Sequence, residues 1–338
     1  MNIPLSRLAV VVAVGSVALV AHAGMTSASV AVAHTTAVPV THLSSAAGVS
    51  HTTRSAKQTG RPKGSTGSHG LAPAGSGRTS GNTSGATCDG VTNDTPAIQA
   101  AVDAAAKQPR GVVTIPAGVC ALYGRIHLSG SNGVTITGAG DTQTFLVQHS
   151  SSNIFQITSP GNTVESMNLD TATFNPGLVP ILKHPVPAVL FSDASNTTVM
   201  NIAAETGTGF GMRLTGTNPC YLFPTTGSVV SNVTMVNRGT GGFAAVDIDC
   251  QNGARLTNIN IRGGILALYN DTNTVLNGET YHGVNACQPA WFVTGPASNI
   301  LIENVVTYAG LGVVHDSRHG AATGITVLNQ TKGLGATC

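Results

Sequence analysis

The sequence has few charged and few aromatic residues: charged residues make up 9% of its 338 residues and aromatic residues 4%. This composition disfavours long surface helices, which need charged outer faces. One long apolar run is present, Leu8–Ala21, and its roughly 14 residues fall short of the roughly 20 that a transmembrane helix needs. Arg7 before it and Ala21-His22-Ala23 at its end are typical of a secretory signal. We expect residues 1–23 to be cleaved from a secreted protein that then has no membrane contact; the alternative is an uncleaved anchor.

Acidic residues are absent from Gly24 to Ala86, a stretch dominated by Ser, Thr, Gly and Ala. Such a composition buries too little apolar surface to offset its ordering entropy, so we expect residues 24–86 to be a disordered linker. Its sparse basic residues indicate a solubilising tether or, alternatively, contact with an anionic cell wall. Without the six basic residues of the signal and linker, residues 87–338 contain 10 basic and 14 acidic residues. This balance of −4 disfavours a nucleic-acid-binding surface.

The sequence lacks a C-x-x-C pair, and none of its histidine clusters has the spacing of a zinc site. All six cysteines lie in residues 87–338, and an even number behind a secretory signal indicates disulfides. We therefore expect neither a metal nor a cofactor. The sequence alone leaves the connectivity open; pairing neighbours in sequence order gives Cys88–Cys120, Cys220–Cys250 and Cys287–Cys338.

Hairpin signals such as Asn-Gly are scarce, which disfavours a β-sandwich, the alternative fold. Instead, two sets of short β-branched or apolar runs recur. The first set contains Asn162–Val164, Asn196–Val199, Ser231–Met235, Thr257–Ile261, Asn273–Leu276, Ser298–Ile302 and Thr323–Val327. The second set, whose members start 35, 23, 34, 20, 25 and 22 residues apart, contains Ile154–Thr158, Val189–Asp193, Met212–Gly216, Val246–Cys250, Leu266–Asp271, Trp291–Gly295 and Val313–Asp316.

Two strands per repeat of this length are typical of a β-solenoid, in which each turn buries its apolar positions only by stacking on its neighbours. Asparagine suits the corners between strands because it tolerates the left-handed conformation. We therefore predict one solenoid domain over residues 87–338, and we expect a monomer.

A single amphipathic helix is predicted ahead of the repeats, from Pro96 to Ala105, with Asp94 and Thr95 as its caps. A helix there would protect the open edge of the first turn. The surrounding sequence resembles the opening of the pectate-lyase-like superfamily, which includes polygalacturonases, rhamnogalacturonases, epimerase-like proteins and phage tailspikes. The resemblance implies an all-β, right-handed parallel β-helix with a capping helix, and a polysaccharide substrate or ligand. It is carried by Asp89–Gln99, Val102–Ala105, Gly111–Gly118 and Val134–Gly140.

The candidate catalytic residues are aspartates on two successive runs. In Val246-Asp247-Ile248-Asp249 the two apolar residues should face the core and both aspartates the outside, with backbones about 6.6 Å apart. Such a spacing suits an inverting glycosidase, which needs one acid and one base. The next run adds Asp271 as a third candidate and Tyr269 as a platform for a sugar ring. Arg213, on the preceding run, would hold a uronate through paired hydrogen bonds.

These residues loosely resemble the polygalacturonase pattern. That pattern consists of an Asn-x-Asp strand, a paired Asp on the next turn, a Gly-His-Gly and then an Arg-x-Lys. Asp247-Ile248-Asp249 occupies the first place and Asn270-Asp271 the second. The third element, Gly-His-Gly, has no equivalent, because Tyr281-His282-Gly283 comes too early in the sequence to lie on the same sheet. No Arg-x-Lys follows it either. The resemblance therefore implies a glycoside hydrolase without assigning the acid and the base.

Further substrate-binding candidates lie in Val314–Gly320, where His315, Arg318 and His319 gather in one predicted loop. The alternative there is a polar loop without a role in the site. A calcium-assisted lyase using Asp193, Lys183 and His184 is a second enzymatic interpretation, but it needs more carboxylates than the sequence offers nearby. A noncatalytic β-helix that binds wall polysaccharide is the third.

Overall fold

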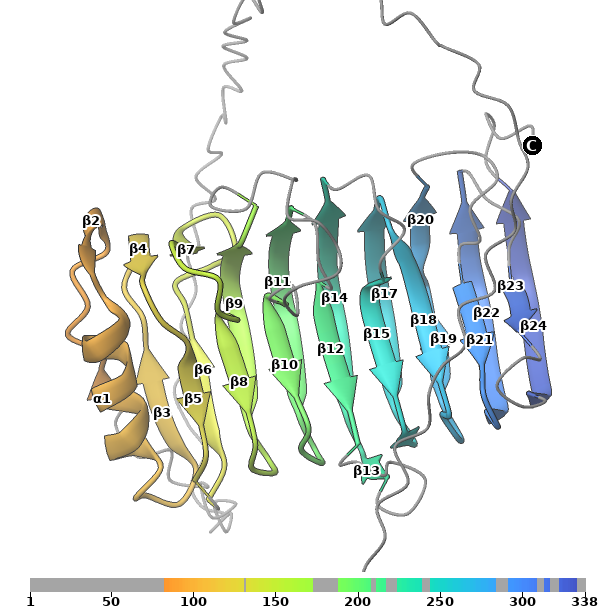
Figure 1. The fold of residues 1–338 in the computed structure, drawn as a ribbon, viewed down its shortest axis with the longest axis horizontal. Coiled ribbons are helices and arrows are strands. Elements are labelled where there is room, and N and C mark those ends of the chain that lie inside the picture. The colour runs from red at the N-terminus through yellow and green to blue at the C-terminus, as the bar shows by residue number, and fades with distance from the viewer. Residues whose placement is uncertain are drawn as a thin grey trace, which may run out of the picture. The chain divides into compact units, whose positions relative to one another are not determined.

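The described residues form a stack of β-strand turns that rises along one axis (Figure 1). The structure is a computed structural model, and it describes residues 82–130, 132–172, 188–207, 211–216, 224–238, 244–283, 291–308, 313–316 and 322–332. Their strands pair in parallel into three sheets, of 14, eight and two strands. The predicted right-handed parallel β-helix is confirmed.

The 14-stranded sheet contains β1 (Asn82–Thr83), β2 (Asp89–Asn93), β3 (Gly111–Thr114), β4 (Gly118–Leu122), β6 (Val134–Thr137), β7 (Thr144–Gln148), β9 (Thr163–Asp170), β11 (Thr198–Thr206), β14 (Val229–Asn237), β17 (Arg255–Arg262), β19 (Val275–Asn277), β20 (Thr280–His282), β22 (Ser298–Thr307) and β24 (Thr323–Lys332). The eight-stranded sheet contains β5 (Ile126–Leu128), β8 (Phe155–Ile157), β10 (Leu190–Ser192), β12 (Met212–Thr215), β15 (Ala244–Asp249), β18 (Ile265–Tyr269), β21 (Trp291–Thr294) and β23 (Val313–Asp316). Two short strands, β13 (Thr225–Thr226) and β16 (Gln251–Asn252), form the third sheet.

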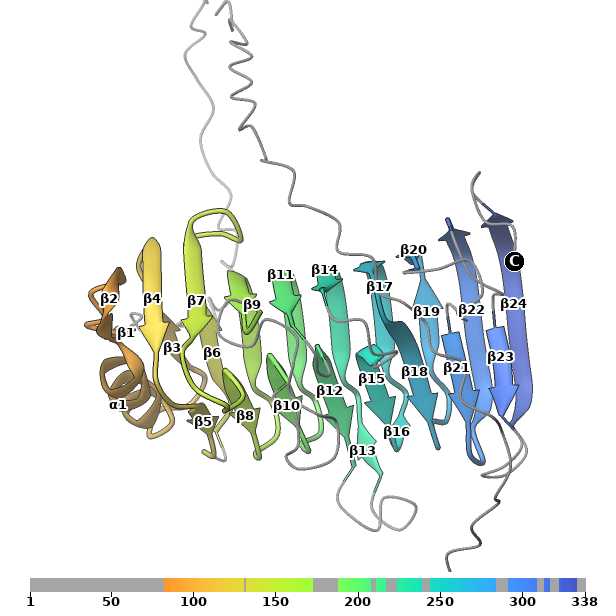
Figure 2. The same ribbon diagram turned by 45° about the horizontal axis from the view of Figure 1, so that its top comes forward.

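Apolar residues recur at the same position of successive turns, and the register stacks them into a continuous core. Val164, Val199 and Val230 are paired in this way on β9, β11 and β14, and none exposes any surface. The polar residues between them lie on the outer face, as the two-residue period of a strand requires. The eight-stranded sheet follows the second set of sequence runs turn by turn (Figure 2).

Asparagines occupy the predicted left-handed conformation at sharp bends of successive turns, within β11, β14 and β17. Asn201, Asn232 and Asn258 have φ angles of 54°, 53° and 55°. Each side-chain amide donates a hydrogen bond to the asparagine of the turn before, at 3.1 Å in both steps. A second ladder joins Asn252, Asn273 and Asn299 at 2.9 and 3.2 Å. These ladders fix the register of successive turns, because a one-residue slip would break every rung.

Helix α1 (Thr95–Ala105) covers the first turn, as expected, and lies against β3 and β5 (Figure 1). Its buried face comprises Ile98, Ala101, Val102 and Ala105. The predicted capping role of Asp94 is wrong: the residue occupies the N-cap position, but its side chain makes no cap hydrogen bond. Its carboxylate instead accepts hydrogen bonds from the backbone amides of Thr87 and Cys88, at 2.7 and 3.2 Å. Asp94 therefore holds the segment before β2 against the start of the helix through these two hydrogen bonds.

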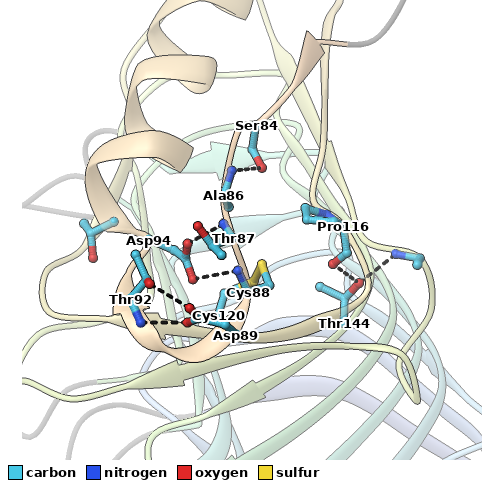
Figure 3. The surroundings of a disulfide bond; sticks show 12 residues. Ser84, Ala86, Thr87, Cys88, Asp89, Thr92, Asp94, Pro116, Cys120 and Thr144 are labelled. Carbon is cyan, nitrogen blue, oxygen red and sulfur yellow. Dashed lines mark hydrogen bonds between the residues drawn. A yellow bond between two sulfur atoms is a disulfide. The ribbon is translucent and has the colours of Figure 1, made fainter.

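A disulfide between Cys88 and Cys120 closes the same region, beside the Asp94 hydrogen bonds (Figure 3). It joins the residue preceding β2 to the middle of β4, and the pairing agrees with the prediction. Cys250 is also disulfide-bonded. Cys220, Cys287 and Cys338 lie outside the described residues, so the other two predicted pairings stay predictions.

The domain begins earlier than residue 87. Strand β1 pairs with β3, and the Ser84 amide donates a 3.0 Å hydrogen bond to the Thr114 carbonyl. The last residues of the expected linker therefore belong to the first turn. The expected signal and the rest of the linker lie outside the described residues. Within the part of the chain that the structure describes, no helix is long and apolar enough to span a membrane.

Candidate active site

Three neighbouring strands of the eight-stranded sheet, β12, β15 and β18, carry the centre of the predicted site. Their register places Arg213 beside Asp247, and it places Asp249 between Thr215 and Tyr269. The intervening Ile248 is completely buried, so the two aspartates project to the outer face as the strand period predicts. Their side chains are 9% and 13% exposed, respectively, which leaves each carboxylate largely covered but within reach of solvent.

Arg213 joins the two aspartates. Its Nε atom lies 3.1 Å from Oδ2 of Asp247, and its Nη2 atom lies 3.4 Å from Oδ2 of Asp249. The hydroxyl of Thr215 donates a further hydrogen bond to the same Asp249 oxygen, at 3.3 Å. Because two protein carboxylates already contact this guanidinium, the arrangement favours ion pairing within the protein over the predicted binding of a uronate by Arg213.

The two carboxyl groups have unequal surroundings. Burial raises the pKa of Asp247 to about 6, against the opposing effect of Arg213 and with a further upward contribution from the Asp249 charge. Burial also raises the pKa of Asp249, but Arg213 and the Thr215 hydrogen bond both favour its ionised form. The site therefore combines a carboxyl group that keeps a proton toward pH 6 with another whose ionised form has two additional favourable contacts, Arg213 and the Thr215 hydroxyl.

Asp271 does not join this pair on the surface, contrary to the prediction. The chain turns a corner at Cys250 and Asn270, which have φ angles of 57° and 56°. The corner inverts the alternation of inward and outward residues, so Asp271 lies on the core side and exposes no surface. Its Oδ1 atom accepts a 2.8 Å hydrogen bond from the backbone amide of Gln251. A carboxyl group in that position cannot contact a polysaccharide.

The corner also fixes the backbone next to Asp249. The Sγ atom of Cys250 lies 3.1 Å from Oδ1 of Asp249, and the disulfide of Cys250 ties this point to another part of the chain. Tyr269 pairs with Asp249 on one side and Thr294 on the other, which places it in the outer column next to the acids. This position agrees with the predicted sugar platform, whose binding role stays a prediction.

The C-terminal candidates are only partly described. His315 pairs with Val293, a completely buried residue, so its register position belongs to the core-side column rather than to the column of Asp249. The neighbouring Asp316 pairs with Thr294 and therefore falls in the acidic column, although it was not among the predicted site residues. Arg318 and His319 lie outside the described residues, and their predicted roles stay predictions.

Sequence reasoning also missed Thr215. Its signal was present, because stacking Met212–Gly216 on Val246–Cys250 residue by residue puts Thr215 beside Asp249. The lyase interpretation relied on Asp193, Lys183 and His184, of which the structure describes only Asp193. Among the described residues, one group of potential metal ligands lies close together: Cys88, Asp94 and Cys120. Both sulfur atoms there form the disulfide, so they are not thiolate ligands.

No protein-family model matches the sequence, and no curated protein matches it. Solved structures do match. Pectin methylesterase PemA from Erwinia chrysanthemi is 11% identical over 77% of this chain and 92% of its own, with a TM-score of 0.50. A 1,3-α-1,4-β-D-galactose-4-sulfate-3,6-anhydro-D-galactose-2-sulfate 4 galactohydrolase is 14% identical, with a TM-score of 0.52. That match covers 71% of this chain, which spans only 61% of the galactohydrolase. The chain thus has the right-handed parallel β-helix fold of the pectate-lyase-like proteins.

Proposed function

We propose that the protein is a secreted glycoside hydrolase that cleaves a polysaccharide with Asp247 as the acid and Asp249 as the base. The observation that carries the proposal is the pair of outward aspartates, held by one arginine in unequal surroundings. Asp247 keeps its proton toward pH 6, which suits an acid that protonates the leaving oxygen. Burial raises the pKa of Asp249 too, but Arg213 and Thr215 both favour its ionised form, which suits a base that activates water.

The reaction proceeds in one displacement. The Asp247 proton goes to the glycosidic oxygen as the bond to the anomeric carbon breaks, and Asp249 takes a proton from the water that attacks that carbon. Two rises of a strand separate the backbones of the acids by about 6.6 Å. This backbone spacing permits the roughly 6.5–9.5 Å between carboxyl groups that an inverting enzyme needs. Because Arg213 is paired with both acids, the sugar bound between them is expected to be neutral.

The test is a reducing-sugar assay on a panel of neutral and uronate-containing polysaccharides. Asp247→Asn and Asp249→Asn should each abolish cleavage, because each removes one proton-transfer step, while Asp103→Asn on the exposed side of α1 should leave it unchanged. Proton NMR of the first product should show the inverted anomer. Cleavage by the Asp249→Asn variant would overturn the assignment. Unsaturated, ultraviolet-absorbing ends would indicate a lyase, and binding without cleavage would indicate a noncatalytic protein.

Secretion is part of the same proposal and rests on the N-terminal sequence pattern. Arg7, the apolar run after it and Ala21-His22-Ala23 together have the order of a signal peptide. N-terminal sequencing of the exported protein should begin at Gly24. A cell-associated protein that still contains its first residues would contradict cleavage and favour the uncleaved anchor.

A further inference from the structure

Behind the acidic pair, a column of buried polar residues faces the interior just past the corner at Cys250. Thr225 pairs with Gln251. The Thr272 amide donates to the Gln251 carbonyl at 2.9 Å, which places Asp271 next to Gln251 on the following turn. Thr225, Gln251 and Asp271 are 5%, 1% and 0% exposed. The column therefore lies within the solenoid, immediately beneath the strands that carry the proposed site.

Two oxygen atoms in this column have no donor among the described residues: Oδ2 of Asp271 and Oε1 of Gln251. The two residues are in register, and the backbone amide of Gln251 already donates to the other Asp271 oxygen, Oδ1, at 2.8 Å. Two buried acceptors on neighbouring residues are costly, whereas a proton on Asp271 turns one of them into a donor for the other. Burial raises the pKa of Asp271 well above its usual range, and the nearby Asp249 and Asp247 charges act in the same direction.

From Gln251 the hydrogen bonds continue to the proposed active site. The Gln251 side-chain amide donates to the hydroxyl of Thr225. That hydroxyl donates to the backbone carbonyl of Thr215 at 3.2 Å. The Thr215 hydroxyl shares its one proton between two acceptors, the Gly216 carbonyl at 3.1 Å and Oδ2 of Asp249 at 3.3 Å. The hydrogen bonds therefore reach Thr215 at its backbone carbonyl, the covalent structure of Thr215 links that carbonyl to its hydroxyl, and the hydroxyl contacts the proposed base.

We propose that Asp271 holds a proton and acts as a positioning residue, closing a buried hydrogen-bond chain through Gln251 and Thr225 that sets Thr215 against Asp249. The inference rests on the proposed function for the role of Asp249, but its structural part is independent of turnover. A protonated Asp271 donates through Oδ2 and accepts through Oδ1, which are the two contacts that an asparagine makes through Nδ2 and Oδ1. Asp271→Asn should therefore reproduce the wild-type chain, and Asp271→Leu should break it.

The experiment measures both variants in the full-length exported protein, by the reducing-sugar pH profile and by carbon NMR titration of the Asp249 carboxyl. Asp271→Asn is expected to keep kcat and the pH profile. Asp271→Leu is expected to lower kcat on the order of 100-fold with KM retained, because the base is displaced rather than the binding surface. It should also raise the pKa of Asp249, since the Thr215 hydrogen bond favours the ionised form.

Thr225→Val supplies a second break in the same chain if Asp271→Leu fails to fold, because valine matches threonine in shape and removes only the hydroxyl. It should shift the Asp249 titration in the same direction as Asp271→Leu. An inactive Asp271→Asn protein would overturn the inference, since it would show that the ionised carboxylate is needed. So would an unchanged Asp249 titration in Thr225→Val. The NMR readout needs no substrate, so it decides the inference even where no polysaccharide is cleaved.

Discussion

Replacing Glu279 should stabilise the protein, and the gain should depend on pH. Glu279 lies between β19 and β20 and is 2% exposed. Both of its carboxyl oxygens lack a hydrogen-bond partner among the described residues. The register aligns it with a column of apolar residues on the other turns: Met167, Ile202, Val233, Ile259 and Val305. A carboxyl group therefore occupies a position that every neighbouring turn fills with a hydrophobic side chain.

The expected magnitude follows from the titration of this group. Burial raises its pKa from 4.5 to about 8, and the charge of Glu303 acts in the same direction. Folding stability is unaffected by ionisation below pH 4.5, falls as the pH rises from there, and reaches its full loss above the folded-state pKa. At about 1.36 kcal/mol per pKa unit, the loss at pH 8 and above is on the order of 5 kcal/mol.

Glu279→Gln removes the ionisation and preserves the shape, so its advantage over wild type should be small at pH 4.5 and reach several kcal/mol at pH 8.5. Glu279→Ile should add stability at both pH values, because it restores the apolar column. Urea denaturation at the two pH values measures both variants. Glu165→Gln, on β9 and away from Glu279, is the matched control. An equal effect of Glu279→Gln at both pH values would refute the reasoning, because a buried ionisation must depend on pH.

Two further perturbations test the N-terminal turn and the acidic pair. In a Cys88→Ser/Cys120→Ser protein the free energy of unfolding should fall by about 4 kcal/mol, since the disulfide closes a 32-residue separation. Thermal denaturation measures the loss, and a variant as stable as wild type would show that the Asp94 hydrogen bonds alone stabilise this turn. Arg213→Gln should raise the pKa of both Asp247 and Asp249, because the guanidinium lowers both, and the pH–rate profile should move to higher pH. An unmoved profile would show that Arg213 has no electrostatic effect on the site.

The stacking of turns was predictable because its signal is repeated. Successive turns place an apolar residue on the core side, and several place an asparagine at the corner; the ladder at Asn201, Asn232 and Asn258 follows from that repetition. The outward direction of Asp247 and Asp249 was predictable for the same reason, since both lie within one uninterrupted strand. The contacts of the Asp94 side chain were not predictable, because the backbone amides that donate to it lie on the chain before the helix rather than within it.

The wrong prediction for Asp271 and the missed Glu279 both arose at corners. There, residues two apart in the sequence no longer face the same side of the sheet. Tyr269 and Asp271 are two residues apart, yet Asn270 between them is left-handed, and the aspartate turns to the interior. The same inversion explains why Glu279 escaped notice. Gly278 occupies the corner that Asn232, Asn258 and Asn304 fill on other turns, so the residue after it belongs to the core column.

Aligning the turns on their left-handed residues, rather than on the strands between them, therefore corrects both readings from the sequence. It separates the acids that can meet a polysaccharide, Asp247 and Asp249, from the acids enclosed beneath the sheets, Asp271 and Glu279. The enclosed pair differs in turn. Asp271 has a hydrogen bond from Gln251 and a chain of donors leading to Asp249, whereas Glu279 has only apolar neighbours in its column. That contrast is why an amide in place of the carboxyl group should preserve function at Asp271 and increase stability at Glu279.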